Sequence, residues 1–160
     1  MPTTPTSTEV ILKAILAGLK VQLPTLLAAA GAPAVKSWDI GERPIHPTTA
    51  LPHVEAIWAG GDQKSDFGSI ENLRDDSFIL SVTIAGSDLE LLELNLIRYN
   101  DCLVAASEKI TVTTLGGSQR ILAVRHRRRT EPEEHGPKGI RLTTGILVEL
   151  NDVIHVRGTP

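Results

Sequence analysis

The stretch SFILSVTIAGSDLELLELNLIRYNDCLVAAS, residues 77–107, contains two different hydrophobic periods, one on each side of a glycine–serine step. Its first part alternates apolar and polar side chains, and the apolar ones are Phe78, Leu80, Val82 and Ile84. That period of two predicts a strand with one buried face. Its second part spaces the apolar residues by three and four, and these residues are Leu89, Leu92, Leu96, Tyr99 and Leu103. That period predicts an amphipathic helix.

The start of this helix carries local signals of its own. Ser87 followed by Glu90 has the spacing of a capping box, in which each side chain binds a backbone amide of the first turn. The leucine stripe behind it covers only about two heptads, which is short for a coiled coil. We therefore predict that the helix packs on the sheet of its own domain.

The preceding residues predict a first helix and a first hairpin. Residues 1–7 are rich in Pro, Thr and Ser and are predicted to be a flexible arm. Apolar residues then recur with helical spacing from Val10 to Leu23, Pro24 is predicted to kink or restart the helix, and a short helical piece is predicted to end at Gly31. We expect a loop with a brief extended piece at 35–40, a strand at 53–59 and a polar loop at 60–76.

The last third of the chain predicts two more strands, residues 118–127 and 139–150. The second alternates, and its apolar face contains Ile140, Leu142, Ile146 and Val148. Residues 151–160 are predicted to be a C-terminal tail. The predicted fold is α+β, a single domain over 1–160 in the order α-β-β-α-β-β. In it, two helices pack on one face of a four-stranded antiparallel sheet.

Composition limits the class of protein. The chain has 160 residues, of which 41% are hydrophobic, 22% charged and only 3% aromatic, so the core must be aliphatic. The net charge of −3 argues against a dedicated nucleic-acid-binding module, which usually carries a basic surplus. We find no stretch with the length and apolarity of a membrane span and expect no membrane partner.

A dense group of charges lies between the last two predicted strands, in VRHRRRTEPEEHGPKG, residues 124–139. We select seven of its side chains as candidate contacts with subunits or partners: Arg125, Arg127, Arg128, Arg129, Glu131, Glu133 and Glu134. If the strand period continues, Arg125, Arg127 and Arg129 share one face. A solvated loop, a protein contact and a DNA contact all remain open for this group.

Signatures of catalysis and of cofactors are weak. The glycine pair in GGDQKS lacks the spacing and the strand–helix context of a phosphate loop, and the single cysteine, Cys102, has no histidine near it in sequence. The five histidines lack the spacing of a helical metal pair. We predict no catalytic residue, no metal and no cofactor, and therefore a protein that is not an enzyme.

Three stretches resemble the tail terminator (tail completion) proteins of long-tailed bacteriophages. They are HVEAIWAGG, SFILSVTIAGSDLELLELNLIRYNDCLVAA and ITVTTLGGSQRILAVRHRRR with GIRLTTGILVEL, about two-thirds of the chain. The TLGG turn at 114–117, between the second helix and the third strand, is the most suggestive piece. The similarity is one of order, length and pattern rather than of a single specific motif.

The resemblance implies a structural virion protein without enzymatic activity. Such proteins assemble in the host cytoplasm as a ring, usually of six copies, at the head–tail junction. They close the tail tube, stop its polymerisation and provide the surface for head attachment. The implied partners are further copies of the chain, the tail tube protein and a head completion or connector protein, with DNA passage through the lumen as a further contact.

Two other classes stay open from the residues alone. One is a nucleic-acid-binding module that uses the arginines at 125–129, although the EPEE sequence beside them opposes it. The other is a small enzyme or ligand-binding domain whose site is assembled from separate loops. Another component of the head–tail connector, a stopper or an adaptor, is a further alternative within the virion.

Overall fold

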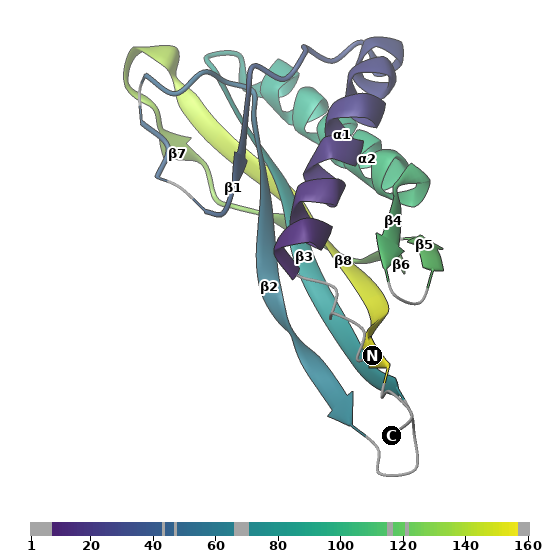
Figure 1. The fold of residues 1–160 in the computed structure, drawn as a ribbon. Helices are drawn as coiled ribbons and strands as arrows, with labels where there is room; N and C mark the ends of the chain where they lie inside the picture. Colours follow the sequence, from purple (N-terminus) through teal and green to yellow (C-terminus); the bar gives the residue numbers. More distant parts are fainter. Residues whose placement is uncertain are drawn as a thin grey trace.

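The structure is a computed structural model of the chain that describes residues 8–42, 44–46, 48–65, 71–114, 117–120 and 122–156. For residues 62–65, 71–74, 114, 117–120, 122–128, 138 and 151–156 it describes the backbone alone. The predicted arm at 1–7 lies outside the described residues. The predicted α+β class is confirmed: two helices cover one face of a sheet (Figure 1).

The two helices differ from the prediction in their details. The first, α1, runs without interruption from Thr8 to Ala30 and includes Pro24, so the predicted restart is wrong. Its apolar stripe continues past the proline, so the helix stays packed against the core on both sides of Pro24. The second, α2, spans Leu89–Lys109, and its N-cap is Asp88, whose carboxylate accepts a 3.2 Å hydrogen bond from the amide of Leu91. The predicted Ser87 cap is one residue too early.

The sheet is larger than predicted and is mixed. It has six strands in the order β1-β2-β3-β8-β6, with β7 beside β8, and β4 and β5 form a separate two-stranded sheet. The bounds are β1 Ser37–Ile40, β2 His53–Ser65, β3 Glu71–Gly86, β4 Thr111–Thr114, β5 Gly117–Arg120, β6 Leu122–Arg129, β7 Glu133–Glu134 and β8 Ile140–Val156. A short 3₁₀ helix, η1, spans Gly136–Lys138. The four long strands β2, β3, β8 and β6 form the antiparallel part.

The parallel pair of β1 and β2 corrects the prediction of a purely antiparallel sheet. Ser37 pairs with His53 and Ile40 with Ala56, in the same direction. Parallel neighbours need a connection that returns the chain to the starting end of the first strand. Residues 41–52 provide that return, so the stretch predicted as a plain loop makes a small crossover.

Three strands are longer than the sequence pattern predicted. β2 and β3 pair through residues 60–65 and 71–76, where a polar loop was expected, and β8 continues to Val156, past the expected end at Leu150. The proposed C-terminal tail therefore starts with six residues of strand. Residues 60–65 and 71–76 are mostly polar, and residues 151–156 do not alternate apolar and polar side chains. The strand structure of these segments therefore comes from pairing with neighbours rather than from an apolar period.

The core lies between the helices and one face of the sheet. All the predicted core residues are buried except two: Leu89 is 56% exposed, and Ile140 is only partly buried. Leu89 was assigned to the stripe by spacing, but it occupies the first position of α2, before the helix reaches the sheet. The first helix contributes six buried side chains: Ile11, Ile15, Leu16, Leu19, Leu23 and Leu27.

The prediction that no stretch has the length and apolarity of a membrane span needs correction. The helix α1, Thr8–Ala30, has the length and apolarity of a membrane-spanning helix by those two criteria alone. In the structure its leucines and isoleucines face the sheet core, whereas Lys13 and Lys20 are exposed on its outer side. The buried part of the apolarity of α1 is therefore accounted for by the core, whereas Val10 and Val21 on its outer side are exposed.

Candidate assembly surface

The face of the sheet away from the helices is polar and hollowed. Cross-strand rows on this face include Glu55, Ser81 and Gly145, and next to them His53, Thr83 and Thr143. The hydroxyl groups of Thr83 and Thr143 are 2.9 Å apart and share a hydrogen bond. A cavity of about 350 Å³ lies above these rows. Its wall includes Glu42, Pro44 and Ile45 and, from the charged segment, Arg129, Thr130 and Glu133.

Arg141 connects two segments that form the wall of this cavity. Its guanidinium donates a 2.9 Å hydrogen bond to the carbonyl oxygen of Ile45 and a second hydrogen bond to the carboxylate of Glu133. The side chain of Arg141 is 21% exposed and that of Glu133 is 58% exposed. One arginine of β8 thus joins the 41–50 loop to the charged segment that contains β7.

The charged group at 125–134 forms contacts outside its own loop. Arg129, at the end of β6, pairs with Glu93 of α2, and Glu133 pairs with Arg141, while Glu131 and Glu134 are exposed. In the sheet, Arg127 pairs with Ile146, Arg128 with Gly145 and Arg129 with Thr144. Arg127 and Arg129 therefore occupy register positions two apart. The side chains of Arg125, Arg127 and Arg128 lie outside the described residues.

These ion pairs position the segment more than they stabilise the fold. The side chains of Arg129 and Glu93 are 48% and 40% exposed. Pairs with this exposure contribute about 0–1 kcal/mol each. The ion pairs of Arg129 and Glu133 therefore set the orientation of the hairpin. The exposed Glu131 and Glu134 remain available to a partner.

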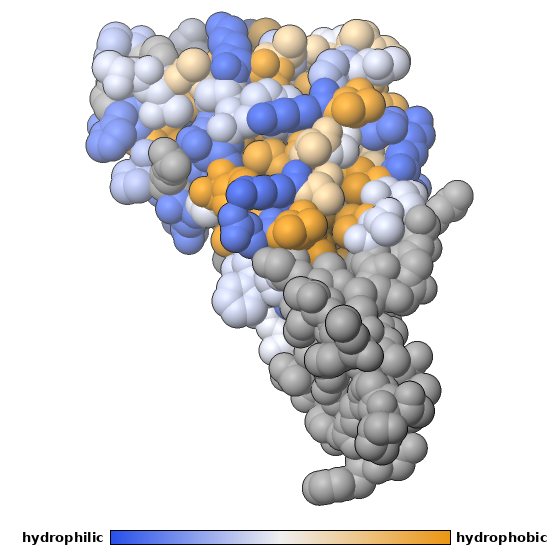
Figure 2. Space-filling view, in the orientation of Figure 1, coloured by the Kyte–Doolittle hydropathy of each residue, from blue (hydrophilic) through white to orange (hydrophobic). Residues whose placement is uncertain are grey.

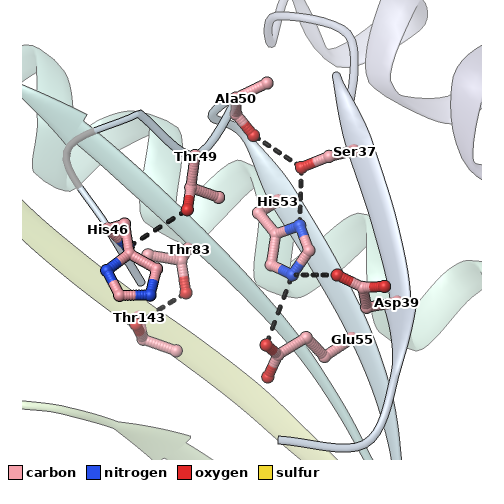
Figure 3. A network of polar contacts seen from close by, with 9 residues as sticks. All are labelled: Ser37, Asp39, His46, Thr49, Ala50, His53, Glu55, Thr83 and Thr143. Carbon is pink, nitrogen blue, oxygen red and sulfur yellow. Dashed lines mark hydrogen bonds and ion pairs between the residues drawn. The ribbon is translucent and has the colours of Figure 1, made fainter. Parts of the chain in front are cut away.

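A buried histidine joins β1 to β2 on the same face (Figure 3). His53 is 2% exposed, its Nδ1 lies 2.6 Å from Ser37 Oγ, and its Nε2 lies 3.3 Å from Glu55 and 3.6 Å from Asp39. The Ser37 hydroxyl donates to the carbonyl oxygen of Ala50 at 2.6 Å. Because that hydroxyl has one proton, its oxygen accepts from His53 Nδ1.

The same residues contain a serine, a histidine and a carboxylate, as hydrolytic triads do. A triad serine passes its proton to the histidine, whereas the proton of Ser37 is directed at a backbone carbonyl. Glu55 lines the cavity, but Ser37 and His53 are absent from the described residues that line it. We interpret the cluster as a polar joint that holds β1 and the 41–52 crossover against β2.

Sequence reasoning assigned no role to His53. The signal that could have found the cluster is the pair His53 and Glu55, which lie two residues apart on one strand and alternate with the apolar Val54 and Ala56. The partner residues Ser37 and Asp39 could not be assigned, because they depend on the parallel β1–β2 register.

The remaining thiol and the metal-ligating residues form no further site among the described residues. Cys102 is 7% exposed, and burial raises the pKa of its thiol. A raised pKa keeps the thiol protonated and unreactive. Across the described part of the chain, no group of three His, Cys, Asp or Glu residues could hold a metal ion.

The helix side of the molecule carries exposed apolar residues. On α2 these are Leu89, Leu91, Leu94 and Ile97, and on α1 they are Val10 and Val21. Trp58 of β2 is 53% exposed, and its indole nitrogen donates a 3.1 Å hydrogen bond to the buried Asp76. Exposed large apolar side chains that recur on neighbouring elements mark protein contact surfaces.

The comparisons with known proteins identify no family. No protein-family profile and no curated protein matches the chain. Among solved structures, the chain is similar to one in the virion of a native gene transfer agent (GTA) particle. The two are 16% identical, the TM-score is 0.43, and the match covers 95% of this chain and 100% of that chain. A likeness of this degree carries no conclusion about family or function.

Proposed function

We propose that this chain is a non-enzymatic structural protein of a phage-like virion that assembles as a ring at the head-proximal end of the tail. In that position it would stop growth of the tail tube and provide the surface for head attachment. Six copies is the number that the resemblance to tail terminators implies. The proposal rests on that resemblance and on one structural observation.

The observation is a strand arm, residues 62–65, 71–75 and 151–156, in which β2, β3 and β8 continue past the helix layer (Figure 1). Four to six residues of strand at about 3.3 Å each give the arm a length of roughly 13–20 Å. No described helix covers this arm, and a narrow ribbon of strands has little stability alone. A neighbouring subunit or the tail tube would supply that layer, so the arm supports an assembling protein.

The edges of the sheet support the same proposal. β1 at one edge has four residues and β6 at the other has eight, and each pairs on one side only among the described strands. Open edges attract further strands and are covered in stable assemblies. A closed ring covers such surfaces in every copy.

The test is complementation in the phage or phage-like particle that encodes this chain. Deletion of the gene is expected to give heads and separate, overlong tails, and the full-length chain supplied in trans is expected to restore joined particles. Electron microscopy of joined particles should show a ring of this chain between tube and head. A single copy at that position, or normal tails without the gene, would refute the proposal.

A further inference from the structure

The outer sides of the two helices carry complementary stripes. On α1 the exposed stripe contains Val10, Lys13, Ala17, Lys20 and Val21. On α2 the exposed stripe contains Glu90, Leu94, Ile97, Asp101 and Glu108. Each stripe has an apolar part. The charges beside it on α1 are Lys20 and Lys13, and Lys13 is paired at 2.6 Å with Glu9 of the same helix, so this side of α1 keeps a net positive charge. The charges beside the stripe on α2 are mainly acidic. Figure 2 shows hydrophobic and hydrophilic residues side by side on the face that α1 covers.

The charges on the two helices are opposite in sign and equal in spacing. Lys13 and Lys20 are seven residues apart on α1, and Asp101 and Glu108 are seven apart on α2, which is about 10.5 Å in each helix. In an antiparallel alignment Lys13 lies opposite Glu108 and Lys20 opposite Asp101.

The same alignment brings the apolar parts together. Val21, which is 72% exposed, then lies beside Ile97, which is 51% exposed, and Leu94 follows one turn further along α2. Burial of these exposed side chains in the contact favours association. The ion pairs fix the register of the two helices more than they increase the affinity of the contact.

We propose that α1 of one copy of this chain packs antiparallel on α2 of the next copy. In one chain both helices lie on the same sheet face and turn these stripes outward, so the contact is not made within a chain. A second copy is the partner, because it presents the stripe of opposite charge at the matching spacing. The two stripes differ, so the contact is head-to-tail, and its repetition closes into a ring when the rotation fits. The inference deepens the proposed ring by assigning its subunit contact.

Charge reversal with rescue tests the contact. Lys13→Glu/Lys20→Glu and Asp101→Lys/Glu108→Lys are each expected to lose the assembled species in sedimentation, because like charges then meet. An equal mixture of the two variants is expected to assemble again, since every contact in an alternating ring is complementary. Melting temperatures close to that of the natural chain show that both variants fold.

Cross-linking between copies gives an independent readout. In a Cys102→Ser background, an equal mixture of Val21→Cys chains and Ile97→Cys chains is expected to form mixed disulfide dimers on oxidation, and neither variant alone should do so. Val10→Cys with Ile97→Cys is the matched control, because the alignment separates these positions.

Four results would overturn the contact. In the charge-reversal experiment these are normal assembly of either variant alone, or failure of the equal mixture to assemble. In the cross-linking experiment it is disulfide formation within one cysteine variant only. The fourth is a natural chain that stays monomeric up to its solubility limit. Binding of the natural chain to phosphatidylcholine vesicles through α1, in place of self-association, would also overturn it. Complementation measures the virion role separately, so a ring built on another interface would refute this contact and leave that role standing.

Discussion

Asn100, in the middle of α2, donates a 2.7 Å hydrogen bond from its side-chain amide to the hydroxyl oxygen of Thr144 in β8. The two residues are 6% and 4% exposed, and apolar side chains surround them in the core. A directional bond inside an otherwise aliphatic layer fixes the position of the helix along the strand, which apolar contacts alone do less strictly.

Thr144→Val tests this bond. It leaves the buried amide of Asn100 without this acceptor, so we expect the free energy of unfolding in urea to fall by about 1–3 kcal/mol. The double variant Asn100→Leu/Thr144→Val should lose less than the sum of the two single variants, because it leaves neither polar partner behind. A double variant whose loss equals that sum would show that the two side chains are uncoupled.

Leu96→Ala and Leu89→Ala form a matched pair in one helix. Leu96 is 4% exposed, and its truncation should cost about 2–5 kcal/mol of stability. Leu89 is 56% exposed, and its truncation should change stability by about 0.5 kcal/mol or less. Urea titrations followed by circular dichroism measure both values, and similar losses for the two variants would mean that α2 packs differently.

The single tyrosine makes the fold sensitive to alkali. Tyr99 is 1% exposed and donates a 2.5 Å hydrogen bond to the carbonyl oxygen of Pro33. Burial, and next the nearby Cys102, raise the pKa of Tyr99 well above its ordinary value. Because the folded pKa is the higher one, the stabilisation is complete below about pH 10, where unfolded tyrosine ionises.

Above that pH the stabilisation declines as the pH rises towards the folded-state pKa. Denaturant unfolding of the natural chain and of Tyr99→Phe over the alkaline range isolates the effect: the difference in stability should shrink as the pH increases. Phenolate absorbance should appear together with unfolding. Its appearance in the fully folded chain near pH 10 would show that Tyr99 is accessible to solvent.

Replacing Arg127, Arg128 and Arg129 together by Ser tests the role of the charged segment. We expect a folded protein that fails to give joined, infectious particles, because the proposed contact with a subunit, the tube or the head connector loses its basic side. Arg129→Ser alone is the control: it removes the pair with Glu93, at a cost of about 0–1 kcal/mol. Normal particle yield from the triple variant would leave this segment as solvated surface.

The parts of the fold that the sequence predicted are those with a strong hydrophobic period. Residues 78–84 and the stripe from Leu92 to Leu103 have one apolar face each, and the buried side chains of the structure follow those faces. The class and the order of the long elements could be predicted for the same reason: each amphipathic face has to be buried against another.

The missed parts depend on contacts between distant segments. The continuation of β2 and β3 into residues 60–76 has no apolar period, and the parallel pairing of Ser37 with His53 depends on the 41–52 crossover. Arg129 could be recognised as charged but not as the partner of Glu93, 36 residues earlier in the chain. Local spacing carries no information about such pairs.

The position of β8 has a consequence for synthesis. It pairs with β3, β6 and β7, so an interior strand of the sheet is the last described one to leave the ribosome. Until residues 140–156 emerge, β3 and β6 have no strand between them, and the apolar face of α2 lacks one of the strands that it packs on. Early domains fold while later residues are still being made. This one cannot complete its sheet before β8 is made, and every premature stop before β8 yields a chain in which the edges of β3 and β6 that β8 covers stay open.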